Sequence, residues 1–382
     1  MSIAVRNCSK LLLSIITIIA ASMYLLSSSQ HYLFNFLSYY QRLFETGESL
    51  RVQSIQNVSR YTGEAIDIDD KCKGMFQIVK RPKKKQTIVW ECSKDLKCGG
   101  LGDQIRSIVS LFVYANDRNY NFNVLGLEPY SFYPEIFLPN LYDWRNKSTM
   151  QNSVKFQWVL NDCEWDLPYK YIRISTSMQF NDNAKCDDWR HDSVRKVMKN
   201  WLSDYKPQVR GCGFWYLFKV GPYLDKMLKQ HESIFFKWLK TKNYTQIVSI
   251  QIRAGDKVLI GREHPSTELV GKYLTCAKKL EKKLGFEKTV YLLSTDSEEL
   301  KKSVKNDLIF TTSIIPKHTG IFTTGEKYVI NGKNMLAQAL VEVIMMAKTN
   351  AIIRSHSGFG ITAAHLGMME NVYQSTYPEC LK

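Results

Sequence analysis

The feature that most constrains this chain is an apolar run at residues 247–252 that ends abruptly in the polar sequence Arg-Ala-Gly-Asp at 253–256. The run consists mainly of β-branched residues, which is typical of a buried strand. In α/β folds, the carboxyl end of such a strand presents ligand-binding side chains. Arg253 is a natural partner for phosphate, because its planar guanidinium donates two parallel hydrogen bonds. This segment alone is equally compatible with a surface salt bridge that closes a turn.

Strand and helix patterns alternate along the chain, which predicts an α/β fold. The first half contains a βαβ unit with a strand at 87–90, a glycine-rich turn at 98–104, a helix at 104–118 and a strand at 122–125. Glycines at such a turn let backbone N–H groups approach an anion at the helix N-terminus, although a purely structural tight turn fits equally well.

The remaining chain is regular at its end and less regular in its middle. Between residues 126 and 240 the sequence predicts a strand at 171–174 and helices at 188–202 and 222–240. After the central strand, the predicted helices are 267–284, 334–348 and one ending at 366, and the predicted strands are 289–293, 308–310, 351–353 and 372–373.

Three predicted strands of the second half end in polar residues. These are Gln251 and Arg253, then Asp296, then Ser355 and Ser357. Because the carboxyl ends of parallel strands meet at one edge of a sheet, we expect these side chains to converge on one crevice.

The N-terminus contains a candidate membrane segment. Residues 11–26 carry no charge, the uncharged stretch continues to 30, and Arg6 and Lys10 precede it. This predicts an uncleaved anchor within 11–29, with the N-terminus cytoplasmic and the bulk of the chain lumenal. The net charge of +16 by itself allows a nucleic-acid partner, but the anchor argues against one and makes the basic run at 80–85 a solvated linker.

Cysteines and sequons agree with a secretory setting. Eight of the nine cysteines follow the anchor and are available for disulfides, and three N-glycosylation sequons begin at Asn57, Asn146 and Asn243. A metal site is not expected, because no Cys-x-x-Cys pair has zinc spacing and the Asp-x-Asp sequence at 67–69 lies in a predicted stem with no strand before it.

Four motifs, in this order, resemble those of the fucosyltransferase superfamily, which includes α1,2-, α1,6- and protein O-fucosyltransferases. They are Gly-Gly-Leu-Gly-Asp-Gln-Ile at 99–105, Gln-Ile-Arg-Ala-Gly-Asp at 251–256, Ser-Thr-Asp at 294–296 and Ser-His-Ser-Gly-Phe-Gly at 355–360. The first is most similar to plant-type α1,2-fucosyltransferases. The family's usual second motif is His-x-Arg-Arg-Gly-Asp, so Gln251 and Ala254 depart from it and leave one positive charge fewer.

The resemblance implies a GT-B type fold, in which two Rossmann-like domains face a cleft, with GDP-fucose as donor and no metal or other cofactor. It implies that Arg253 grips the diphosphate, and Asp256 is a candidate catalytic base with Asp103 as an alternative. The residues implied to bind the donor are Gly100, Gly102, Asp103, Gln251, Asp296, Ser355, Ser357, Gly358 and Phe359.

The expected organisation is a cytoplasmic tail and anchor (1–30), a stem (31–80), an acceptor-side domain (81–240) and a GDP-sugar domain (241–382). We expect a single-pass type II protein of the Golgi or endoplasmic reticulum that transfers fucose, with inversion, to a glycan or glycoprotein, and the resemblance favours an α1,2 linkage to galactose. The alternatives are core α1,6- or protein O-fucosylation, and a catalytically degenerate glycan-binding protein tethered to the membrane.

Overall fold

The computed structural model describes residues 72, 76, 86–92, 100–117, 119–126, 133–145, 153–157, 171–175, 207–254, 267–316 and 332–374. The chain divides into two compact units, residues 1–59 and 60–382, and every described residue belongs to the second. The predicted anchor at 11–29 and the predicted helix at 188–202 lie outside the described residues. No helix in the described ranges is long and apolar enough to cross a membrane.

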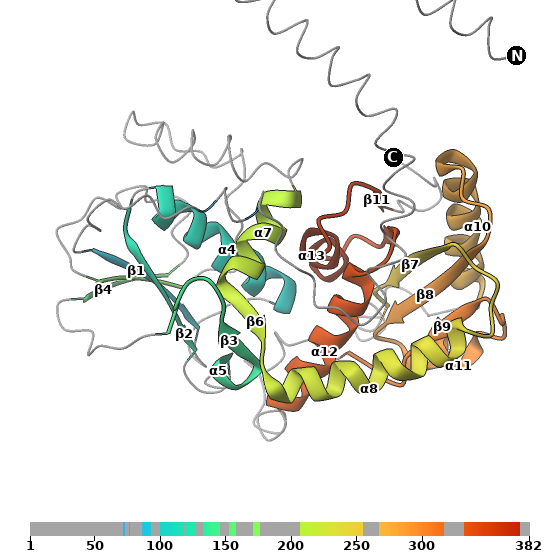
Figure 1. The fold of residues 1–382 in the computed structure, drawn as a ribbon, viewed down its shortest axis with the longest axis horizontal. Coiled ribbons are helices and arrows are strands. Elements are labelled where there is room, and N and C mark those ends of the chain that lie inside the picture. Colours follow the sequence, from blue (N-terminus) through green and yellow to red (C-terminus); the bar gives the residue numbers. More distant parts are fainter. Residues whose placement is uncertain are drawn as a thin grey trace, which may run out of the picture. The chain divides into compact units, whose positions relative to one another are not determined.

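The first sheet has four parallel strands (Figure 1). Their order is β2 (Asn121–Gly126), β1 (Thr87–Cys92), β5 (Tyr171–Ser175) and β4 (Ser153–Gln157). Helix α4 (Leu101–Asp117) connects β1 to β2 and packs on both, which confirms the predicted βαβ unit. The central strand β1 is buried along its whole length.

The second sheet has five parallel strands and contains the apolar run at residues 247–252. Their order is β11 (Val372–Gln374), β10 (Ala351–Arg354), β7 (Gln246–Ile252), β8 (Thr289–Thr295) and β9 (Ile309–Thr311). β7 and β8 are buried from their second residue onward, as expected of apolar strands covered on both faces. All five strands were predicted to within about two residues. The described chain is an α/β protein with two parallel sheets, as the sequence predicted.

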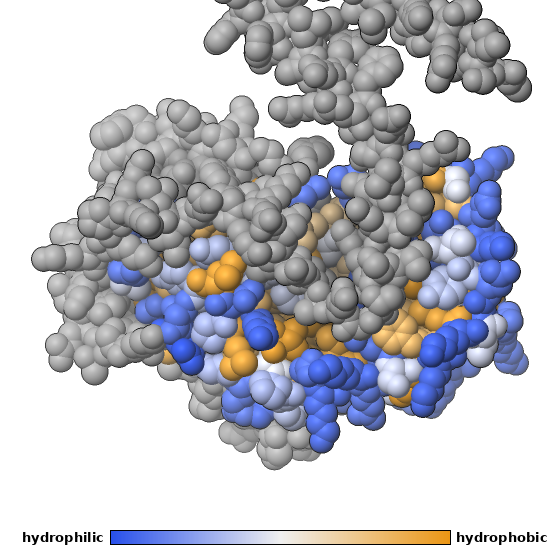
Figure 2. All heavy atoms as spheres, viewed as in Figure 1, coloured by the Kyte–Doolittle hydropathy of each residue, from blue (hydrophilic) through white to orange (hydrophobic). Residues whose placement is uncertain are grey.

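Helices cover the second sheet and join it to the first. They are α8 (Pro222–Leu239), α10 (Thr267–Leu284), α11 (Glu298–Ser303), α12 (Gly332–Ala347) and α13 (Gly358–Leu366). Helix α10 is amphipathic and packs on β7 and β10, and the surface over α10 and α11 is largely hydrophilic (Figure 2). Helix α12 is apolar nearly all round, because it contacts α8, α13 and β8.

Several short elements between residues 126 and 220 were not predicted. They are α5 (Tyr133–Ile136), β3 (Phe137–Pro139), α7 (Pro207–Leu217) and β6 (Phe218–Val220), besides β4. β3 and β6 form an antiparallel pair. Helix α7 has no polar face, because it contacts α4 on one side and α13 on another, so the 3.6-residue period that marks a surface helix is missing.

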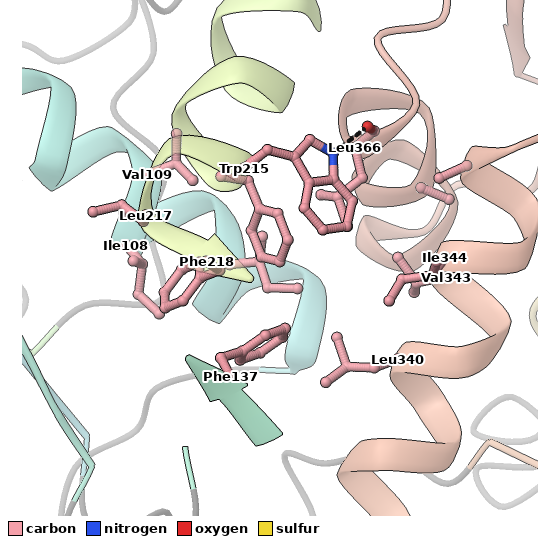
Figure 3. Packing of buried hydrophobic residues seen from close by; sticks show 14 of the residues in the cluster. Ile108, Val109, Phe137, Trp215, Leu217, Phe218, Leu340, Val343, Ile344 and Leu366 are labelled. Carbon is pink, nitrogen blue, oxygen red and sulfur yellow. Dashed lines mark hydrogen bonds between the residues drawn. The ribbon is translucent and has the colours of Figure 1, made fainter. Parts of the chain in front are cut away.

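Helix α13 connects the two halves through close packing with α4 and α7. The Trp215 indole Nε1 of α7 donates a hydrogen bond to the Leu366 carbonyl oxygen of α13 at 2.8 Å (Figure 3). A Cβ atom on Gly211 of α7 would lie 2.2 Å from the carbonyl oxygen of His365, so only glycine permits this approach. One continuous apolar cluster therefore runs from the first sheet to α12.

A disulfide ties the segment before β1 into this core. Cys72 is bonded to Cys212 of α7, and Cys72 and Phe76 are both fully buried. Cys92 and Cys276 are disulfide-bonded as well. The globular part of the chain therefore already includes residues before position 80.

A buried histidine at the junction predicts a pH-dependent stability. Burial, and then the positive charges of Arg210, Arg106 and Arg354, hold the pKa of His365 well below its ordinary value of 6.5. The folded protein thus binds fewer protons than the unfolded chain, so the free energy of unfolding should fall by up to about 1.4 kcal/mol per pH unit as the pH drops below 6.5.

His365→Gln should flatten this dependence in urea denaturation measured between pH 7 and pH 5.5. His356, nine residues earlier, is exposed, so His356→Gln is the matched control and should retain the wild-type slope. Equal slopes for His365→Gln and the wild type would contradict the assignment.

Candidate functional site

A cleft of about 580 Å³, part of it open to solvent, lies where the strand ends of the second sheet face the first turn of α4. It is lined by Gly100, Leu101, Gly102, Asp103, Gln251, Arg253, Ser294, Thr295, Asp296, Pro316, Ala339, Gly358 and Phe359. These residues come from both halves of the described chain, and three of them, Asp103, Arg253 and Asp296, carry a charge.

The ends of β7, β8 and β10 are fastened together by side chains. The Arg253 backbone N–H donates to Ser355 Oγ at 3.1 Å, and that hydroxyl donates to Gln251 Oε1 at 3.0 Å. The next backbone N–H, of Ala254, donates to Asp296 Oδ1 at 2.7 Å. Residues that follow both neighbouring strands thus hold the backbone at Arg253 and Ala254. This fixes the position from which the Arg253 side chain extends.

The N-terminus of α13 forms another wall of the cleft. Ser357 is its N-cap, and its hydroxyl accepts a hydrogen bond from the Phe359 N–H at 3.2 Å. Gly358 and Phe359 line the cleft directly. The first-turn amides of a helix and its dipole favour a negatively charged ligand, so this wall suits an anion.

The first turn of α4 forms the facing wall. Asp103 Oδ2 accepts a hydrogen bond from the Gly100 N–H at 3.3 Å, and its Oδ1 lies 2.5 Å from Arg106 Nη2. Asp103 is partly exposed to the cleft, whereas Arg106 is buried. The carboxylate of Asp103 is therefore engaged by its own helix turn and by a guanidinium behind it.

The two helix N-termini touch at a pair of glycines. A Cβ atom on Gly102 would lie 2.5 Å from the Gly358 carbonyl oxygen, closer than real Cβ contacts come. The Thr362 hydroxyl lies 2.8 Å from that carbonyl oxygen and 3.3 Å from the Gly102 carbonyl oxygen, so it bridges the two helices. This contact fixes how closely the two helix N-termini, both of which line the cleft, approach each other.

The structure brings most of the predicted site residues to this cleft. Those that line it are Gly100, Gly102, Asp103, Gln251, Arg253, Asp296, Gly358 and Phe359. Ser355 and Ser357 lie just behind, where they hold the backbone of Arg253 and the first turn of α13. Asp256 lies outside the described residues. What each residue binds stays a prediction.

Pro316 and Ala339 line the cleft but were not predicted. The segment leading to Pro316 is held by the buried Lys301 of α11, whose ammonium contacts the Thr312 hydroxyl at 3.0 Å and Glu342 Oε1 at 3.1 Å. Ala339 comes from the middle of α12. Neither residue type carries a chemical signal in sequence, so only the packing of α11 and α12 reveals them.

Comparisons with known proteins give a fold. No protein-family profile matches the sequence, and no curated protein matches it. Among solved structures, an Arg-to-Lys mutant of Arabidopsis thaliana FUT1 in complex with GDP aligns over 87% of this chain and 80% of its own, with a TM-score of 0.53 and 13% identity. The chain has the FUT1 fold.

Two other solved structures give weaker alignments. Fucosyltransferase NodZ from Bradyrhizobium aligns over 78% of this chain and 98% of its own, at 14% identity and a TM-score of 0.47. POFUT1 in its apo form aligns over 79% of this chain and 100% of its own, at 9% identity and a TM-score of 0.34. The fold assignment rests on FUT1, whose TM-score exceeds 0.5.

Proposed function

We propose that this protein is an inverting glycosyltransferase that moves fucose from GDP-fucose to a glycan hydroxyl. The observation that carries the proposal is that residues from all four sequence motifs line one cleft. The first of these residues is Gly100 and the last is Phe359, so they are spread over more than 250 positions of the chain. The FUT1 fold, seen there in complex with GDP, supports the same conclusion.

The chemistry follows from the charges that line the cleft. Transfer breaks the bond between the anomeric carbon of fucose and a phosphate oxygen, and the bonding electrons leave with GDP. Arg253 and the first-turn amides of α13 are fixed groups that stabilise this growing negative charge. The acceptor hydroxyl attacks the anomeric carbon from the opposite face, which inverts its configuration, and gives its proton to a base.

The base is assigned to Asp256 on its position after Arg253. The two carboxylates among the described lining residues already have partners, Asp103 in Arg106 and the Gly100 N–H, and Asp296 in the Ala254 N–H. We assign no metal to the reaction, and transfer should persist in EDTA.

Product analysis of the purified protein tests the activity. The proposal expects fucose transfer from GDP-fucose and not from GDP-mannose, with a terminal β-galactoside as acceptor and an α1,2 linkage in the product. Core N-glycans and folded small domains are tested as competing acceptors. The acceptor that receives fucose distinguishes the α1,2-, α1,6- and protein O-fucosylation reactions. GDP binding without transfer to any acceptor would favour a degenerate glycan-binding protein instead.

We further propose a Golgi or endoplasmic reticulum membrane location, with the anchor at 11–29 and the cleft in the lumen. Asn243, the described sequon asparagine, is exposed in the turn before β7, so it is accessible to modification. Protease protection in sealed vesicles, with loss of one glycan in Asn243→Gln, tests the topology. A protease-sensitive, unglycosylated chain would place the cleft in the cytosol.

A further inference from the structure

The net charge of the residues that line the cleft opposes the binding of a nucleoside diphosphate. The charged lining residues are Asp103, Arg253 and Asp296, which sum to one negative charge. Asp103 lies on the wall that faces the N-terminus of α13, where the diphosphate is proposed to sit. An uncompensated carboxylate at this position would repel the ligand that the helix N-terminus attracts.

Arg106 is placed where it cancels that charge. Its Nη2 lies 2.5 Å from Asp103 Oδ1, and its side chain is 8% exposed whereas that of Asp103 is 39% exposed, so solvent reaches this ion pair mainly from the side of the carboxylate. A Cβ atom on Gly358 would lie 2.8 Å from the same Nη2 and 3.3 Å from Asp103 Oδ1. The ion pair therefore lies directly against the first residue of α13, and any side chain at 358 would displace it.

We infer that Arg106 is a positioning residue that neutralises and orients Asp103 and so adapts the cleft to an anionic donor. This inference rests on the proposed function. Arg106 does not line the cleft itself. It acts through Asp103, whose second oxygen accepts the Gly100 N–H and so fixes the glycine turn that faces the donor. Its contribution is electrostatic, so it should depend on the phosphate charge of the ligand.

The test compares Arg106→Met, Arg106→Lys, Asp103→Asn and the double variant Asp103→Asn/Arg106→Met by calorimetric titration with GDP and with guanosine. Arg106→Met leaves a bare carboxylate near the diphosphate and should weaken GDP binding roughly tenfold. Arg106→Lys retains the cation and should stay closer to the wild type. Asp103→Asn removes the negative charge from the wall that faces the diphosphate and should tighten GDP binding, and the double variant should recover affinity relative to Arg106→Met.

Guanosine, which has no phosphate, should bind all four variants with the same affinity. A purely structural role predicts instead that Arg106→Met and Asp103→Asn weaken GDP and guanosine alike, and that result would overturn the inference. If Arg106→Met fails to fold, Asp103→Asn decides alone, because tighter GDP binding supports the inference and weaker binding refutes it. A wild-type protein that does not bind GDP would refute the proposed function itself.

Discussion

Purified Arg253→Ala should lose fucose transfer by about 10² to 10³-fold while remaining folded, since removing one fixed group that stabilises transition-state charge typically costs this much. Arg253 is the cationic side chain among the described residues that line the cleft, so within this lining no second guanidinium substitutes for it. The fold should survive, because the hydrogen bond to Ser355 uses the backbone N–H of Arg253, which alanine retains.

Arg253→Lys should also transfer poorly, because an ammonium cannot make the paired, planar hydrogen bonds of a guanidinium. The measurement is kcat/KM for GDP-fucose, accompanied by thermal unfolding of each variant. Arg145 is an exposed arginine paired with Asp143, and it does not line the cleft, so Arg145→Ala is the matched control and should keep wild-type turnover. Near-normal turnover in Arg253→Ala would refute the assignment.

Gly102→Ala should separate the two helix N-termini that frame the cleft. The added methyl group would lie 2.5 Å from the Gly358 carbonyl oxygen and 2.6 Å from its carbon, both of them backbone atoms that cannot swing away. Relief requires a shift of α4 against α13 of about 1 Å, and such a displacement at a reacting centre can cost about 10²-fold in rate. Overpacking of this kind also destabilises by about 1–3 kcal/mol.

A second glycine-to-alanine change isolates this steric effect from the general effect of alanine in a helix. Gly271 is exposed in α10, and a Cβ atom there meets nothing within 4 Å. Gly271→Ala should therefore stabilise the protein by about 0.5–1 kcal/mol and leave transfer unchanged. Chemical denaturation and donor kinetics of both variants test the contrast, and equal activity of Gly102→Ala and Gly271→Ala would show that the helix contact does not set the cleft.

The sequence by itself determined the second sheet and the residues at its edge. Strands such as β7 and β8 are largely continuous apolar runs that stop at polar residues, and parallel pairing then requires Gln251, Ser294 and their neighbours to lie side by side. Helix α10 was predicted at its observed bounds, because an amphipathic surface helix shows its period openly. The local residue pattern, together with the pairing of neighbouring strands, is sufficient to predict such elements.

Only the tertiary structure decided which elements form the wall of the cleft that faces the second sheet. Helix α7 shows no period because it is buried between α4 and α13, and the contact of Gly102 with Gly358 joins residues 256 positions apart. Arg106 gives no signal in sequence beyond one more charge on a helix, yet packing places it behind Asp103 and against α13. Periodicity records which face of an element is covered, whereas the charge and width of a site depend on which elements cover it.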